Sequence, residues 1–160
     1  MRQQQAFTLV ELLVVLAVMA ILVGVVFPGF QGMLARNNLS TSANSMILAI
    51  NYARSEAVRE GGGVTLDAVD PSDDSNEWGP GWEVSSADGT LLRTFEAVGG
   101  DLILDSPDDV SSIAFTSQGG VAAGASRTLD LCLPGVSGVQ ITIAAIGRAS
   151  TSDLTAAECP

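Results

Sequence analysis

This chain of 160 residues carries a net charge of −11 and contains neither Lys nor His, and its length suits one small domain plus a further segment. The acidic balance argues against nucleic-acid binding, because contacts to phosphate need accumulated positive charge. Without His the commonest general base and metal ligand are missing, and the Ser, Asp and Glu residues form no recognisable catalytic set. We therefore expect no enzyme activity, no cofactor and no bound metal.

The N-terminal segment is a long apolar run with one acidic residue near its start. Residues 7–27 supply the roughly 20 apolar residues that a bilayer-spanning helix needs. Glu11 lies inside this run, where a carboxylate is costly and calls for a partner. The small residue Ala6 precedes the run, whereas an ordinary secretory signal has its small-residue cleavage site after it. We therefore expect the apolar run to be retained.

The segment Ala6-Phe7-Thr8-Leu9-Val10-Glu11 resembles the processing signal of type IV pilins and pseudopilins, although Ala6 stands where that family usually has Gly. The resemblance implies that a prepilin peptidase cuts after Ala6 and that Phe7 becomes an N-methylated N-terminus. It also implies a helix kink at Pro28. The alternative is a plain signal anchor with an incidental glutamate.

The same resemblance implies a partner for Glu11. In a filament, the carboxylate of one subunit could meet the α-amine of Phe7 in its neighbour. An unpaired charge among packed apolar helices is costly, so this ion pair would help to set the axial register between subunits.

An amphipathic helix is predicted to follow Pro28. Its apolar residues recur at spacings of three and four, which is typical of one buried helix face, and they are Leu39, Ala43, Met46, Ile47, Ile50, Ala53 and Ala57. The glycines at 61–63 are predicted to end it. Residues 7–59 would then form one long helix, with a transmembrane or filament-core half at 7–30 and an amphipathic half at 31–60.

Short strands separated by turns are predicted from Val64 onward. The candidate strands are 64–69, 81–85, 91–95, 101–104, 112–116, 127–133 and 140–146, and 119–125 is expected to be a loop. The fold expected is therefore α+β and type IV pilin-like, with a long N-terminal helix packed on an antiparallel β-sheet head. Residues 1–6 would be the leader and residues 64–160 the β-rich head outside the cytoplasm.

A second resemblance lies in the head. Trp78-Gly79-Pro80-Gly81-Trp82 resembles the W-x-x-G-W segment of the GspH/FimT-type pseudopilin family. Residues 113–119, 129–132 and 141–143, with Gly147-Arg148, follow that family's later order. Gly119-Gly120 stands where members often have Gly-Arg. This resemblance implies a minor pseudopilin of a type II secretion pseudopilus, with a minor pilin of a type IV pilus as the alternative.

The two resemblances together imply partners and a location. The partners are other pilins or pseudopilins, the prepilin peptidase and the bacterial inner membrane. The chain would cross that membrane once, with its N-terminus in the cytoplasm and its head in the periplasm, before it joins a periplasmic or surface filament.

Two other functions are alternatives for this chain. Some family members bind DNA through a Gly-Arg-x-Arg motif, but Gly147-Arg148-Ala149-Ser150 lacks the second Arg and lies in an acidic head. A membrane-anchored periplasmic binding protein is the other alternative, and it should tolerate changes at Glu11.

The two cysteines, Cys132 and Cys159, are expected to form a disulfide bond outside the cytoplasm. Closing this loop would contribute about 3.5 kcal/mol through chain entropy. The alternative is two unrelated free thiols, and the wide spacing without His does not suggest a zinc site.

Two further features have simple structural interpretations. Trp78 and Trp82 are expected to pack in the head core rather than form a ligand platform. The acidic loop at 70–77, with Asp70, Asp73, Asp74 and Glu77, could bind calcium, but it lacks the spacing and glycine of an EF-hand. A solvated loop is therefore the expectation.

Overall fold

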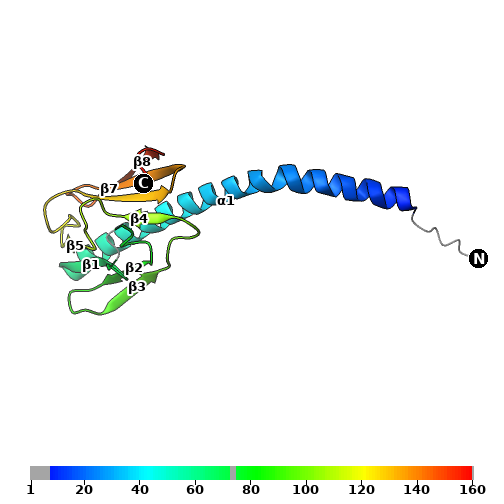
Figure 1. Ribbon diagram of the computed structural model, residues 1–160. Helices are drawn as coiled ribbons and strands as arrows, with labels where there is room; N and C mark the ends of the chain where they lie inside the picture. The colour runs from blue at the N-terminus through cyan, green and yellow to red at the C-terminus, as the bar shows by residue number, and fades with distance from the viewer. Residues whose placement is uncertain (1–7, 73–74, 160) are drawn as a thin grey trace, which may run out of the picture. The chain divides into compact units, whose positions relative to one another are not determined.

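The structure is a computed structural model that describes residues 8–72 and 75–159, with only the backbone described at 23–31. This part of the chain contains one helix and eight strands (Figure 1). They are α1 Leu9–Glu60, β1 Gly62–Ala68, β2 Trp82–Ser85, β3 Leu91–Phe95, β4 Ile103–Asp105, β5 Ser112–Thr116, β6 Arg127–Leu133, β7 Ser137–Ile143 and β8 Ala149–Thr155. The chain divides into two compact units after Arg36.

The first unit contains the start of α1, which Thr8 caps. The backbone N–H of Glu11 donates to Thr8 Oγ1 at 3.2 Å. Thr8 and Glu11 thus occupy the N-cap and third helical positions, which is the spacing of a capping box. The helix is continuous through position 28, and the predicted kink there stays a prediction.

The large apolar side chains of this first unit face outward. Those described between Leu9 and Leu22 are each at least half exposed, and they are Leu9, Val10, Leu12, Leu13, Val14, Val15, Leu16, Val18, Met19, Ile21 and Leu22. In the described part of the chain, no helix combines the length and the apolarity needed to span a membrane.

The second unit contains the C-terminal half of α1, whose predicted apolar face is confirmed. Leu39, Ala43, Met46, Ile50, Ala53 and Ala57 are buried, and Ile47 is partly buried. Ala49 is also fully buried, although the predicted stripe did not include it. The helix ends at Glu60, and Gly61, Gly62 and Gly63 follow with φ of 87°, 110° and 79°. Glycine adopts this region without a Cβ penalty, so the predicted stop is confirmed.

The strands of the second unit form two antiparallel four-stranded sheets. Their orders are β3-β2-β1-β5 and β4-β6-β7-β8. Inward-facing residues of both sheets, such as Leu66 of β1 and Leu131 of β6, join the buried face of α1 in one hydrophobic cluster. The predicted antiparallel head is present, and its division into two sheets is a feature that the strand pattern alone did not predict.

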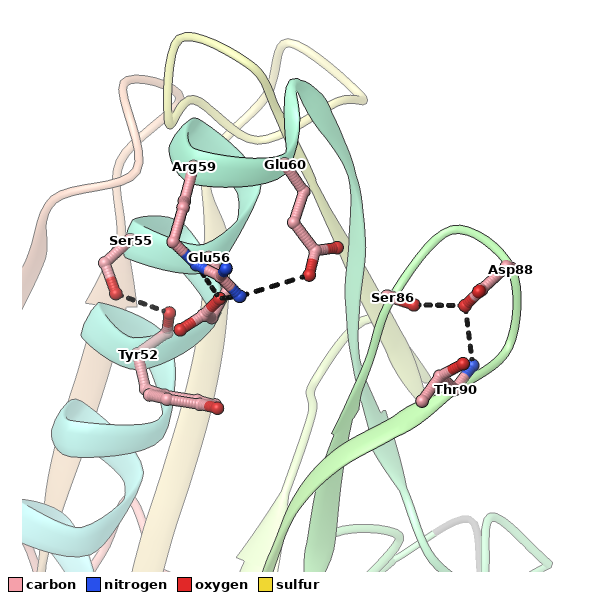
Figure 2. A network of polar contacts seen from close by, with 8 residues as sticks. All are labelled: Tyr52, Ser55, Glu56, Arg59, Glu60, Ser86, Asp88 and Thr90. Atoms are coloured by element: carbon pink, nitrogen blue, oxygen red, sulfur yellow. Dashed lines mark hydrogen bonds and ion pairs between the residues drawn. The ribbon is translucent and has the colours of Figure 1, made fainter.

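The helix and the first sheet are also joined by a cation–π contact between Arg93 of β3 and Tyr52 of α1. The guanidinium of Arg93 lies 5.4 Å from the ring centre of Tyr52 and 5.0 Å from that of Phe95, within the range of cation–π attraction. Within α1 itself, the guanidinium of Arg59 forms ion pairs with Glu56 and Glu60 in the last turn of the helix (Figure 2).

The turn between β2 and β3 is closed by one aspartate (Figure 2). Asp88 Oδ1 accepts hydrogen bonds from the Ser86 hydroxyl and, at 3.0 Å, from the backbone N–H of Thr90. Hydrogen bonds favour the ionised carboxylate, and those from Ser86 and Thr90 lower the pKa of Asp88 to about 2.

Strand β8 was not predicted. Six of its seven side chains are polar or small, and the burial of its residues does not alternate. It pairs with β7 alone, from Ile143↔Ala149 to Ser137↔Thr155. An edge strand of this kind buries little apolar surface, so the period-two pattern that marks the other strands is missing.

Candidate functional site

The strongest candidate site is the start of α1, around Glu11. The side chain of Glu11 is exposed, and together with Leu12, Val15 and Leu16 it lines a shallow hollow on the helix surface. A carboxylate at the third helical position also suits the positive end of the helix dipole. The spacing Thr8-x-x-Glu11 is the sequence signal of this cap, which the sequence analysis did not predict.

Several predicted processing residues cannot be placed. Ala6 and Phe7 lie outside the described residues, as does the side chain of Pro28. The predicted cleavage after Ala6, the methylation of Phe7 and the pairing of Phe7 with Glu11 therefore stay predictions.

The predicted bond between Cys132 and Cys159 is present in the structure. It joins β6 to the residues after β8, with the two Cα atoms 5.4 Å apart, and both cysteines are buried. Gly138 of β7 lies against this bond. A Cβ atom there would come within 2.4 Å of Cys159 Sγ and 2.6 Å of the Leu131 carbonyl oxygen. The disulfide therefore needs glycine at position 138.

Both tryptophans pack in the core, as predicted. Trp78 is fully buried and its Nε1–H donates to the carbonyl oxygen of Val110 at 2.8 Å. Trp82 is 1% exposed and stacks on Phe95 with ring centres 6.1 Å apart. Such burial leaves neither ring face open as a ligand platform.

Trp82 also lines a cavity of mixed polar and apolar character that the sequence did not reveal. Its volume is about 190 Å³, and it lies between the C-terminal half of α1 and the segment after β3. The other lining residues are Asn38, Thr41, Ser42, Ser45, Glu96, Ala97 and Gly99. These residues offer hydrogen-bonding groups and one carboxylate, that of Glu96. No hydrogen bond between a nucleophile and a base is found among these described residues.

The acidic loop is only partly the solvated segment that was expected. Asp70 is exposed and accepts hydrogen bonds from the hydroxyl of Ser72 at 2.6 Å and from its backbone N–H at 3.3 Å, which lower the pKa of Asp70. Asp73 and Asp74 lie outside the described residues. Glu77 departs from the expectation, because it is only 2% exposed and turns inward against β4.

Glu77 meets a second carboxyl group, that of Asp105. One Glu77 oxygen, Oε2, accepts the backbone N–H of Ser106 at 3.2 Å. Burial and the hydrogen bond and charge of Glu77 raise the pKa of Asp105 to about 7. No sequence pattern could have predicted this pair, because its members are far apart in the chain and meet only through the fold.

The Gly147-Arg148 dipeptide lies in the turn between β7 and β8. Gly147 has φ of 81°, and a Cβ atom there would come within 1.9 Å of the Gly119 carbonyl oxygen. Glycine at 147 is therefore needed for the close approach of two turns. Arg148 is exposed, and Ser150 occupies the position of the missing second Arg.

Within residues 8–72 and 75–159, no three His, Cys, Asp or Glu residues are grouped so that they could hold a metal ion.

Comparison with known families and structures adds independent information. The family model of type II transport protein GspH matches residues 42–147, and a prokaryotic N-terminal methylation motif matches residues 1–27. No curated protein sequence matches the chain.

Two solved structures share the fold, both of the type IV minor pilin FimU from Pseudomonas aeruginosa. In one crystal form the identity is 26% and the TM-score 0.64, over 79% of this chain and 95% of the other. In the second form the identity is 24% and the TM-score 0.61, over 76% of this chain and 97% of the other.

Proposed function

The chain belongs to the GspH family of type II transport proteins, and on that premise we propose that it is a minor pseudopilin in the short filament of a type II secretion system. In this role it takes part in protein secretion through filament assembly. A fold hosts many functions, so the proposal rests on the N-terminal site as well as on the family.

The observation that carries the proposal is the exposed apolar surface of α1 with Glu11 at its head. Large apolar side chains between Leu9 and Leu22 are at least half exposed. Soluble monomers rarely expose apolar patches of this kind, so this surface calls for lipid or for other apolar helices. In the membrane it serves as an anchor, and in a filament the same residues pack against neighbouring subunits.

The N-terminal methylation motif over residues 1–27 supports the proposed processing. Residues 1–6 form the leader, which a prepilin peptidase removes after Ala6, and Phe7 becomes the methylated N-terminus. Residues 7–30 cross the inner membrane once, with the head, residues 64–160, in the periplasm. After extraction, Glu11 of one subunit pairs with the Phe7 amine of the next.

The likeness to a type IV minor pilin favours a second candidate function. FimU is described as such a subunit, and its structure resembles this chain over most of its length. In this second role the chain is a minor subunit that primes the assembly of a type IV pilus. It uses the same N-terminal site, but in a different filament.

The test replaces Glu11 with Gln. Glutamine still fits the third position of a capping box, so the variant removes the charge and keeps the helix start. We expect filament assembly to fall severalfold or more, because the Phe7 amine of the neighbour loses its counter-charge. Secretion and pilus assembly are both measured in cells that carry the variant.

The control is Glu96→Gln, which removes one exposed negative charge from the head and should leave both activities intact. Loss of secretion alone supports the pseudopilus, and loss of pili alone supports the type IV pilus. If the Glu11 variant keeps both, the filament role is wrong and a simple anchored protein is the better interpretation.

A further inference from the structure

The two sheets meet where the connection between β1 and β2 crosses the edge of β4. Residues 76–78 form part of a turn that is hydrogen-bonded to Leu104 of β4. The backbone N–H of Leu104 donates to Asn76 Oδ1 at 2.9 Å, and that of Trp78 donates to the Leu104 carbonyl oxygen at 3.1 Å. This contact joins the first sheet, which contains β1 and β2, to the second sheet, which contains β4.

Glu77 and Asp105 bring two carboxyl groups together at this contact. Glu77 is 2% exposed, and the Asp105 carboxyl lies within hydrogen-bonding reach of it. One oxygen of each, Glu77 Oε1 and Asp105 Oδ1, is buried and has no hydrogen-bond partner among the described residues. Buried polar atoms normally have partners, so two orphan oxygens on adjacent acids need an explanation.

No nearby positive charge supplies that explanation. The ion pairs found in the described part of the chain lie at Arg59 and involve neither acid. Asp109, in the turn after β4, adds a further negative charge. Asp130 lies opposite Asp105 on β6, and its own carboxylate accepts from Gln140 Nε2 at 3.0 Å.

We propose that the Asp105 carboxyl stays protonated up to near-neutral pH and that its O–H donates a hydrogen bond to Glu77, so that the two acids form a proton-dependent latch between the two sheets. Two adjacent carboxylates, one buried and one partly buried, cannot both ionise cheaply, and one shared proton removes the repulsion. A proton also fits without a cavity, whereas calcium needs six to eight oxygen ligands. The latch holds residues 76–78 on β4 and keeps Trp78 in the core.

The sign of the pH dependence follows from the direction of the shift. Because the pKa of Asp105 is raised from 3.8 to about 7 in the folded chain, the folded state holds a proton that the unfolded state loses. The contribution of the latch is complete below about pH 3.8, declines as the pH rises and is lost above about pH 7.

The first experiment compares thermal unfolding of the full chain in detergent with that of Asp105→Asn across this pH range. The amide of the variant can donate to Glu77 at any pH. We therefore expect the Tm of the unmodified chain to fall relative to the variant by roughly 5 °C between pH 4 and pH 7. Asp130→Asn, at the paired position of β6, is the control and should follow the unmodified chain. Identical pH dependence in all three proteins overturns the latch.

A second measurement does not depend on the variant folding. The ¹³C shift of the Asp105 carboxyl carbon should titrate near pH 7, and the amide protons of Leu104 and Ser106 should lose hydrogen-exchange protection severalfold above that pH. A midpoint near the ordinary aspartate value of about 3.9 contradicts the proposal. So does a rise in Tm with millimolar calcium above pH 7 that Asp105→Asn abolishes, because a cation would then join the two acids.

Discussion

At the scale of single residues, Gly138 is a tightly constrained position beside the disulfide. Its Cα faces both sulfur atoms of the disulfide, since a Cβ atom there would lie 2.4 Å from Cys159 Sγ and 3.1 Å from Cys132 Sγ. The side chain at 138 and the disulfide bond therefore compete for the same space. This explains why β7 places a glycine in its interior, where glycine otherwise weakens a strand.

We predict that Gly138→Ala prevents or strains the bond between Cys132 and Cys159. Thiol titration of the folded variant without reductant should detect free thiols, and the free energy of unfolding should fall by up to about 3.5 kcal/mol as the loop constraint is lost. Gly99→Ala is the matched control, because its Cβ would meet only the Asn38 side chain, at 3.7 Å or more. A fully oxidised Gly138→Ala chain of unchanged stability contradicts this account.

At the scale of elements, the β2–β3 hairpin depends on the ionised form of Asp88. Because the Ser86 hydroxyl and the Thr90 N–H lower the pKa of Asp88 from 3.8 to about 2, the turn is stabilised above pH 3.8 and loses that stabilisation as the pH falls through about 2. We predict that an NMR titration of the Asp88 carboxyl gives a midpoint near 2.

Ser86→Ala should move that midpoint toward 3.8, since Ser86 is the largest cause of the shift. Ser85→Ala, one residue earlier in the chain, should leave it unchanged. An Asp88 midpoint that ignores the loss of Ser86 counts against the proposed role of this hydroxyl.

The elements also show what the sequence could predict. Strands β3, β5 and β6 have the predicted bounds, because their turns and apolar residues mark them locally. Strand β7 spans 137–143 instead of the predicted 140–146, and β8 was missed because its exposed polar residues give no alternating pattern. Glu77 was expected in solvent for a related reason: its burial depends on β4, which comes later in the chain. Contacts between distant segments leave no local signal.

At the scale of the whole chain, the hydrophobic core lies entirely in the second unit. Every buried residue described in the structure is at position 39 or later, and the unit itself begins at Asn37. All described side chains from residue 8 to residue 22 are exposed, so none of them belongs to this core. We therefore expect the second unit to be stable by itself. The N-terminal apolar residues are then free to contact lipid or other subunits.

We predict that a chain beginning at Asn37 folds without detergent and unfolds in one cooperative transition, with a Tm within a few degrees of the full chain in detergent. Circular dichroism during heating is the measurement. The same shortened chain with Met46→Asp should fail to fold, because Met46 is fully buried and an unpaired charge there is costly. A shortened chain without a cooperative transition shows that the first unit is needed for folding.

The continuity of α1 has a mechanical consequence. The helix runs without interruption from Leu9 to Glu60, so no loop separates the apolar segment from the residues that form the core. Tension applied at the N-terminal end is carried along the hydrogen-bonded backbone to Met46, Ile50 and their neighbours. Withdrawal of the helix from the head would therefore expose Met46 and Ile50, which are buried. The rate at which the head unfolds, rather than its equilibrium stability, therefore governs the force that the chain withstands.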